Sequence, residues 1–218
     1  MKILVIIGHQ HKGSFCHAIA ETVVEEIKGA GQDVTFHDLY EEKFDPILPH
    51  EEIEADLADV DPVVREHLQE VMESHGYVII HPNWWGQPPA ILKGWVDRVL
   101  RKGAVYEFTE AGAKGLLEEK TVVVLTTSNT PRQIELAQFG DPLQNLWMTC
   151  IFGLCGVVDF YRRNFEPIIE STPEQREKWL KEVGKIIRQR FLGEEEEEEE
   201  VVVDLGGLDD DLEELADL

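Results

Sequence analysis

The chain is 218 residues long and 43% apolar, which is enough for one buried core but short for two domains. Its net charge of −24 at pH 7 argues against nucleic-acid binding, because affinity for phosphate backbones needs clustered lysines and arginines, and the sequence has no such stripe. Its longest apolar run, residues 3–7, is far shorter than the roughly 20 residues of a membrane span, so we expect no membrane insertion and a cytoplasmic location.

The cysteines and most histidines show no spacing typical of a disulfide bond or a metal site. Cys16, Cys150 and Cys155 are odd in number and lack short paired spacing, which fits neither a disulfide framework nor a zinc site. We expect Cys150 and Cys155 to be packing residues. Five histidines are expected on the surface: His17, His37, His50, His67 and His75. No bound metal is predicted.

The first elements in chain order are a buried strand and an amphipathic helix. Residues 2–7 form an apolar run without polar alternation, as in a strand covered on both faces, and Gly8 ends it. Apolar residues then recur at helical spacing over residues 15–27, until Gly29 and Gly31 end the pattern.

The same alternation of strands and helices continues along the chain. We expect strands at residues 33–38, 77–81, 122–126 and 156–161, and helices at 62–74, 90–101, 142–155 and 173–191. Residues 39–61 are acidic and interrupted by prolines, which indicates a surface excursion. Five strands alternating with helices predict an α/β doubly wound parallel sheet with helices on both faces, although periodicity does not give the strand order.

The last 25 residues differ in composition from the rest. Residues 194–218 hold fourteen acidic residues and no basic one, so the preceding part carries a net charge of only −10. We therefore divide the chain into a domain at 1–193 and an acidic tail at 194–218. A disordered solubilising tail is the favoured interpretation. The alternative is a short helix whose leucine stripe, from residue 205 to 218, docks on a partner protein.

Ligands in open α/β sheets bind beyond the carboxyl ends of the strands, which directs attention to three loops. The first reads Gly-His-Gln-His-Lys-Gly-Ser-Phe over residues 8–15. Ser14 can cap the following helix, and the amides at a helix start favour an anion, with His9, His11 and Lys12 close by. The glycine spacing matches neither a Walker loop nor the dinucleotide fingerprint. The loop is either a phosphate site or an ordinary capped turn.

The other two loops carry aromatic and short polar side chains. Residues 81–89 read His-Pro-Asn-Trp-Trp-Gly-Gln-Pro-Pro, and two tryptophans stiffened by prolines suit a flat ring system. Burial of both tryptophans in the core is the less favoured alternative, because neighbouring residues at a strand end seldom both point inward. Residues 126–131 read Thr-Thr-Ser-Asn-Thr-Pro, which can hydrogen-bond a heteroaromatic edge but is also ordinary turn sequence.

Together the three loops resemble those of the flavodoxin-like NAD(P)H:quinone oxidoreductase family, which includes DT-diaphorase, modulator of drug activity B and the ancillary reductases of potassium efflux systems. The most specific part is residues 82–98, where Pro-Pro-Ala-Ile-Leu-Lys-Gly-Trp-Val-Asp-Arg is similar to the family's loop and following helix. The resemblance implies a flavodoxin-like sheet of order 2-1-3-4-5, FMN or alternatively FAD as a noncovalent cofactor, NAD(P)H as electron donor, a quinone-like small-molecule acceptor and a homodimer with active sites at the subunit boundary.

The resemblance also assigns roles to individual residues. The flavin phosphate and ribityl chain would be held by His9, Ser14, Phe15 and Cys16, the last standing where relatives often have asparagine. One side of the isoalloxazine would be lined by Pro82, Asn83, Trp84 and Trp85. Its pyrimidine edge would be bonded by Thr126, Thr127, Ser128 and Asn129. The candidates for the acceptor pocket are Tyr106, Phe108 and Asn129, with residues 139–142 and Trp147 as weaker ones.

One departure from the family leaves the chemistry incompletely assigned. Mammalian-type relatives carry Thr-Thr-Gly-Gly followed by a tyrosine and a histidine that support charge on the reduced flavin, whereas Ile134 falls where the tyrosine would be. No proton donor can be named from the sequence. The function that fits best is ping-pong hydride transfer from NAD(P)H to quinones. A flavin-binding regulatory subunit of a membrane transporter and a flavodoxin-type electron carrier are the alternatives.

Overall fold

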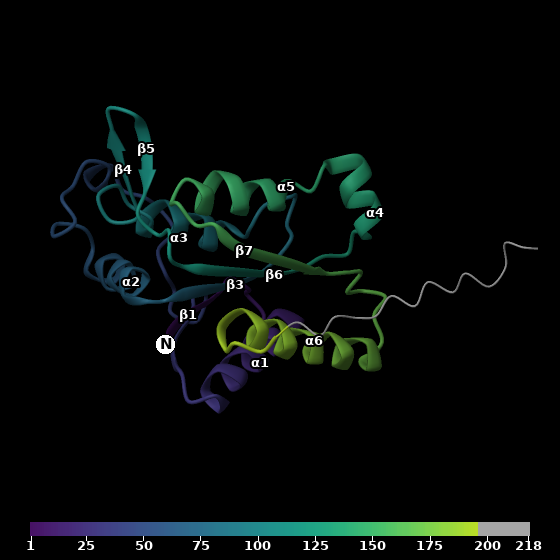
Figure 1. Ribbon diagram of the computed structural model, residues 1–218. Helices are drawn as coiled ribbons and strands as arrows, with labels where there is room; N and C mark the ends of the chain where they lie inside the picture. Colours follow the sequence, from purple (N-terminus) through teal and green to yellow (C-terminus); the bar gives the residue numbers. More distant parts are fainter. Residues whose placement is uncertain (196–218) are drawn as a thin grey trace, which may run out of the picture.

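A computed structural model describes residues 1–195 of the chain, which are built around a central parallel sheet (Figure 1). The sheet has five strands in the order β2-β1-β3-β6-β7, and every neighbouring pair is parallel. The strands are β1 (Lys2–Ile7), β2 (Asp33–Asp38), β3 (Gly76–Pro82), β6 (Thr121–Thr127) and β7 (Asp159–Phe165). Counted within the sheet this is the order 2-1-3-4-5, so the expected flavodoxin-like arrangement is confirmed.

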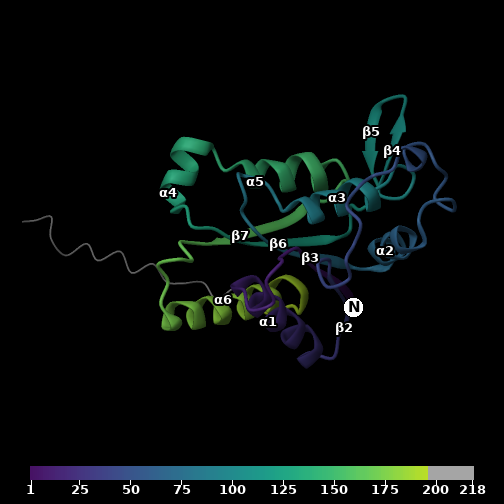
Figure 2. The ribbon, with the colours of Figure 1, turned by 180° about the vertical axis from the view of Figure 1, so that it is seen from behind.

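Helices cover both faces of the sheet, as Figures 1 and 2 show. One face carries α1 (Phe15–Gly29) and α6 (Pro173–Phe191), and the other carries α2 (Pro62–Glu73), α3 (Ala90–Val99) and α5 (Pro142–Gln144) with its π-helical continuation η3 (Asn145–Gly153). Successive strand residues point to opposite faces, so Ile3 and Val5 pack in the α1–α6 core while Leu4 and Ile6 pack in the other. This double burial explains the uninterrupted apolar run of β1.

Two elements were not expected from the sequence. An antiparallel hairpin, β4 (Tyr106–Thr109) and β5 (Gly112–Gly115), projects beyond the end of α3 (Figure 1). A short helix, α4 (Arg132–Ile134) with its π-helical continuation η2 (Glu135–Phe139), follows β6.

The predicted bounds of the last strand were shifted toward the N-terminus, and only residues 159–161 of the expected range lie in it. We expected residues 156–161, whereas β7 spans Asp159–Phe165. Gly156 has a φ of +89° and belongs to the turn that follows η3, so the strand begins later. The strand continues through Arg162 and Arg163, whose charges are neutralised by Asp141 and Glu182 from other elements.

The excursion at residues 39–61 is anchored to the domain instead of lying loosely on its surface. It contains a short helix, η1 (His50–Glu52). The Arg98 guanidinium on α3 donates to both Glu52 carboxylate oxygens, at 2.7 and 3.2 Å, and to the Asp45 carbonyl at 2.8 Å. Gly94 on the same helix leaves no room for a Cβ, which would lie 2.2 Å from the Pro46 carbonyl oxygen. The excursion therefore packs closely against α3.

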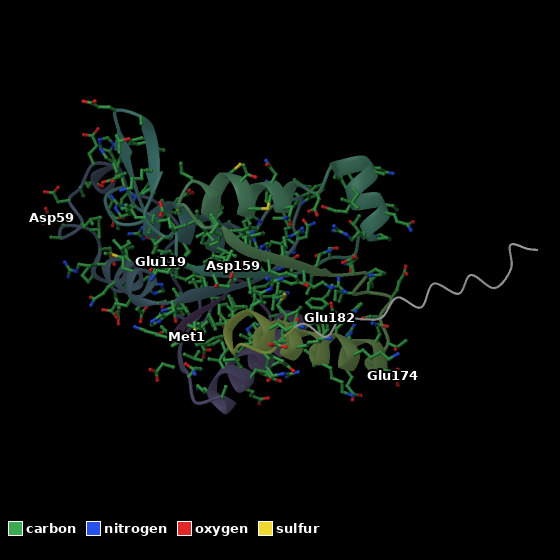
Figure 3. All side chains as sticks on the ribbon, viewed as in Figure 1. Met1, Asp59, Glu119, Asp159, Glu174 and Glu182 are labelled. Carbon is green, nitrogen blue, oxygen red and sulfur yellow. The ribbon has the colours of Figure 1, made fainter. Side chains whose placement is uncertain are left out.

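Asp59 and Glu174 lie at opposite edges of the molecule in Figure 3, and both side chains are exposed. No helix within residues 1–195 is long and apolar enough to cross a membrane. Nearly all of the predicted acidic tail, and its possible partner-binding helix, lies outside the described residues.

Candidate functional site

The three loops singled out in the sequence begin side by side at the carboxyl edge of the sheet. The Gly8 amide donates to the Ile80 carbonyl at 2.9 Å, and the Asn83 amide donates to the Thr127 carbonyl at 2.7 Å. The Ser128 amide donates in turn to the Phe165 carbonyl at 3.1 Å. These bonds continue the ladder beyond the strand ends and bring the backbones of the three loops together.

The first loop ends at the start of α1, where Ser14 is the N-cap. Its Oγ accepts from the His17 amide at 3.3 Å, and the other amides of the first turn have no carbonyl of their own helix to bond. His9 Nδ1 accepts from the His11 amide at 3.1 Å, so the neutral ring carries its proton on Nε2. Burial lowers the pKa of His9, and the neighbouring His17 and His11 lower it further. The loop therefore offers an anion the neutral His9 ring and the backbone amides at the start of α1 as hydrogen-bond donors.

Cys16 lies inside the fold rather than in the loop. Its side chain is buried among apolar residues between α1 and the sheet, and Sγ lies 3.3 Å from Thr127 Oγ1. Burial raises the pKa of this thiol to about 12, against a smaller lowering by the hydrogen bond to Thr127. Cys16 therefore links the first loop to the third as a neutral thiol, and its predicted contact with the flavin would involve its backbone.

The second loop holds a tryptophan in a constrained turn. Trp84 and Gln87 exchange two backbone hydrogen bonds of 3.0 Å, and between them Trp85 and Gly86 have φ values of +56° and +71°. Positive φ at both central residues is typical of a type I′ turn. It costs a non-glycine residue on the order of 1–3 kcal/mol, and such strain is concentrated at functional sites. Trp85 is fully exposed and Trp84 is 40% exposed, so neither belongs to the core.

Asn83 and Glu135 hold this turn in place. Asn83 Oδ1 accepts from the Gly86 amide at 2.9 Å, and its Nδ2 donates to Glu135 Oε1 at 3.2 Å. Glu135, on η2, is only 3% exposed. A buried carboxylate thus braces the tryptophan turn from a segment 52 residues away in the sequence. Sequence reasoning missed Glu135.

The third loop is tied to the end of β7 by side-chain hydrogen bonds. Thr126 Oγ1 donates to Asn164 Oδ1 at 2.8 Å, and Asn164 Nδ2 donates to Ser128 Oγ at 3.0 Å. Thr126 is fully buried, so its hydroxyl is used within the fold, as is that of Thr127. Asn129 is exposed and accepts from the Ile169 amide at 3.0 Å. The Ser128 hydroxyl also donates to the Thr130 carbonyl at 3.1 Å, so Asn129 and Thr130 carry the side chains of this loop that remain for a ligand.

A cleft of about 530 Å³ lies between the second and third loops. It is lined by Asn83, Trp85, Gly86, Ser128, Asn129, Thr130, Glu135, Phe139 and Pro142. Its volume falls within the usual range for small-molecule sites, and aromatic walls with a few convergent amide and hydroxyl groups suit a flat heteroaromatic ring. The sequence predictions for Asn83, Trp85, Ser128 and Asn129 thus fall on one cleft.

Tyr106 and Phe108 lie elsewhere. They belong to the β4–β5 hairpin, which lies at the opposite end of the α3–α5 layer from α4 in both views (Figures 1 and 2). Tyr106 lines a larger cleft, of about 730 Å³, together with Leu48 and Ile53 of the excursion. That cleft lies away from the three loops at the carboxyl edge, where α/β sheets bind ligands, so we assign the site to the smaller one.

The segment behind the cleft is fixed by a buried ion pair. Asp141 Oδ1 and Oδ2 accept from Arg162 Nη1 at 2.8 and 2.9 Å, and Arg132 Nη1 approaches Oδ2 to 3.2 Å. This pairing holds the junction between η2 and α5, and so Phe139 at the cleft. Trp147 is fully buried and donates its indole N–H to His81 Nε2 at 2.9 Å. The suggestion that Trp147 reaches an acceptor is therefore wrong.

A second cluster of ligand-type residues lies near the excursion. Atoms of His37, Glu42 and His67 lie within 4.8 Å of one another. The expectation of a surface histidine is wrong for His67, which is 3% exposed and accepts from the Trp95 indole at its Nδ1. That bond places the proton of the neutral ring on Nε2, the atom that faces Glu42. His67 therefore has no lone pair to offer a metal in this cluster.

The comparisons with known proteins agree with the geometry. The family model described as a flavodoxin-like fold matches residues 1–189. An uncharacterized NAD(P)H oxidoreductase of Haemophilus influenzae is 32% identical over 161 residues, which cover 72% of this chain and 79% of that protein. The chain belongs to the flavodoxin-like NAD(P)H:quinone oxidoreductase family.

A second relative and a solved structure extend the comparison. The FMN-dependent NADH:quinone oxidoreductase of Sinorhizobium medicae is 31% identical over 171 residues, covering 73% of this chain and 82% of that protein. The crystal structure of Smu.1420 from Streptococcus mutans is 31% identical and superposes with a TM-score of 0.78, covering 87% of this chain and all of the other.

Proposed function

We propose that the protein is a flavin-dependent NAD(P)H oxidoreductase that uses FMN to reduce quinones or similar small acceptors by ping-pong hydride transfer. The observation that carries the proposal is the position of the cleft, which opens between the tryptophan turn and the β6 loop, with the start of α1, whose first amides suit an anion, beside them. The relative of S. medicae that is named for FMN, NADH and quinone supports the choice of cofactor and acceptor.

The residues present fit this cofactor. Ser14 and the amides at the start of α1 would hold the phosphate group, with His9 and Phe15 beside them. Trp84 and Trp85 would form one wall for the isoalloxazine, supported by Pro82 and Asn83. The bound flavin supplies the hydride chemistry, and the protein positions and polarises it. FAD is the alternative cofactor.

The third loop would stabilise the charge that develops on the reduced ring. Asn129 carries an amide group at the cleft, and a preorganised donor of this kind acts strongly in a site that excludes water. Ser128 lines the cleft beside it, with its hydroxyl used within the loop. Thr126 and Thr127 would contribute through the backbone, since their hydroxyls are used elsewhere.

The acceptor also needs a proton, because reduction of a quinone to a hydroquinone takes up one hydride and one proton. Among the residues that line the cleft, Glu135 is the single ionisable side chain. It accepts from Asn83 at 3.2 Å and forms part of the cleft wall. Glu135 is thus the candidate to relay a proton between water and the acceptor.

A homodimer completes the proposed site. Phe108 is 65% exposed on a hairpin that points away from the cleft of its own chain. In a twofold dimer the same hairpin of each subunit can face the cleft of the other, which would bring Tyr106 and Phe108 to the acceptor pocket.

The test is steady-state turnover of NADH and of NADPH with a soluble quinone, measured with and without added FMN. We expect turnover that depends on FMN and that falls in Asn129→Ala and Glu135→Gln, with sedimentation showing a dimer. The matched control is His50→Asn, which changes an exposed histidine on η1, outside the cleft lining. Absence of quinone reduction with both nucleotides in the presence of FMN would overturn the proposal.

A further inference from the structure

Ser14, His17 and Asp38 form a continuous chain of hydrogen bonds behind the start of α1. Ser14 Oγ lies 2.9 Å from His17 Nδ1, and His17 Nε2 lies 3.0 Å from Asp38 Oδ2. Asp38 is the last residue of β2 and is 6% exposed. Its other oxygen accepts from the amides of Tyr40 and Glu41, at 3.1 Å each, which fixes the carboxylate toward the ring.

The direction of these bonds decides what Ser14 can offer to an anion. Asp38 accepts hydrogen bonds only, so His17 Nε2 carries a proton. With a neutral ring, Nδ1 has a lone pair, and the Ser14 hydroxyl donates its proton to it. Ser14 then presents only lone pairs to the loop, and these repel a phosphate.

A second proton on the ring reverses this arrangement. The imidazolium donates from Nδ1 to Ser14 Oγ and from Nε2 to Asp38, so the Ser14 hydroxyl proton is free to point into the loop. The same proton also places a positive charge on His17, which contacts Ser14 directly behind the anion site. Both effects favour a phosphate group, and both need the carboxylate of Asp38 to hold the ring.

We propose that His17 and Asp38 are positioning residues that aim the Ser14 hydroxyl at the phosphate of the flavin nucleotide, and that phosphate binding draws one proton onto His17. This inference rests on the proposed function and deepens it, because it names the residues that orient the phosphate-binding hydroxyl and set the charge behind it. The proton comes from water and stays on the ring until the nucleotide leaves.

The other charged groups around His17 are consistent with a site that changes charge on binding. The ring of His9 packs edge-on at 6.0 Å between centroids, and Lys12 in the same loop is paired with Glu41 at 2.6 Å. The His11 backbone amide donates a hydrogen bond to His9 Nδ1 at 3.1 Å. Asp38 is the carboxylate in direct contact with the ring. The nearby lysine pairs with Glu41 on the exposed surface, whereas His17 is the group in direct contact with the Ser14 hydroxyl.

The experiment compares two flavins that differ only in the phosphate. FMN and riboflavin are titrated by fluorescence into the full-length wild-type protein, His17→Phe and Asp38→Asn, with His50→Asn as the matched control. Loss of one charge-assisted hydrogen bond should weaken FMN binding about ten- to hundredfold in His17→Phe, whereas riboflavin binding should change less than about twofold. An equal loss for both flavins, or an unchanged affinity for FMN, would overturn the inference.

Proton uptake gives a second readout that a purely structural role would not move. Calorimetric titration of FMN is repeated in two buffers that differ in ionisation enthalpy, and the difference in heat gives the protons bound. Wild type should bind more protons with FMN than His17→Phe does, and neither should bind protons with riboflavin. Equal uptake by the two proteins contradicts the proposal. A wild-type protein that binds neither flavin overturns the proposed function itself and, with it, this inference.

Discussion

The buried pair of His81 and Trp147 makes the stability of the fold sensitive to acid. His81 is fully buried, accepts from the Trp147 indole at Nε2 and donates from Nδ1 to the Pro82 carbonyl at 2.8 Å. Both ring nitrogens of the neutral imidazole are therefore engaged in hydrogen bonds. Burial lowers the pKa of His81 from 6.5 to about 4, Arg162 lowers it as well, and the bond to Pro82 opposes them.

The sign of the effect follows from the proton balance. Below pH 6.5 the unfolded chain binds a proton at His81 that the folded chain does not bind, so the free energy of unfolding falls as the pH falls toward about 4. A shift of this size corresponds to about 3 kcal/mol when complete, with a slope of up to about 1.4 kcal/mol per pH unit. His67, whose pKa is lowered to about 4 by burial and by His37, acts in the same window.

The assay is urea unfolding of wild type and His81→Asn at several pH values between 6.5 and about 4. We expect His81→Asn to be less stable than wild type at neutral pH, because the Trp147 indole loses its acceptor at a cost of about 1–3 kcal/mol. We also expect its stability to fall less steeply with acid. Parallel slopes for the two proteins would refute the reasoning, since they would mean that His81 takes up no proton on unfolding.

Three further predictions concern packing and the cleft. Gly94→Ala should lower the unfolding free energy by more than about 1 kcal/mol, because its Cβ would lie 2.2 Å from the Pro46 carbonyl oxygen. Gly29→Ala, which has open space on α1, should raise the unfolding free energy by about 0.5–1 kcal/mol. Thermal denaturation compares the two variants. Trp85→Gly should leave the melting temperature unchanged or raise it, because the substitution relieves a positive φ at a fully exposed residue. The same variant should bind flavin more weakly in a fluorescence titration. A lower melting temperature would contradict this prediction. Glu135→Ala should cost about 1–3 kcal/mol, because Asn83 Nδ2 loses its acceptor, while Glu135→Gln keeps that bond and should lose less on urea unfolding; equal losses would count against the bracing role.

The sheet could be predicted from the sequence because its central strands are buried on both faces. β1, β3 and β6 are continuous apolar runs, and no other element gives that pattern at such length. β7 could not be placed in the same way. Its charged residues are neutralised by Asp141 and Glu182, and no local pattern shows that these partners lie close in space. The β4–β5 hairpin left a readable signal, since Tyr106 and Phe108 alternate before the turn at Glu110 and Ala111.

The candidate site was predictable as a set of loops but not as a set of contacts. The loop chemistry pointed to residues that now share one cleft, among them Trp85 and Asn129. Cys16 could have been recognised as buried, because it lies three and four residues before Ile19 and Ala20 on the inner face of α1. Glu135 could not, since its role depends on Asn83 far away in the sequence and on a π-helical segment with no known local signature.

The central claim is that the cleft holds a flavin that a nicotinamide nucleotide reduces and a quinone reoxidises. The most direct test mixes the FMN-loaded protein with NADH or NADPH in the absence of oxygen and follows the visible absorption band of the flavin. The account predicts that at least one nucleotide bleaches the band and that a quinone added afterwards restores it in full. A protein that takes up no flavin, or a bound flavin whose band neither nucleotide bleaches, would contradict it.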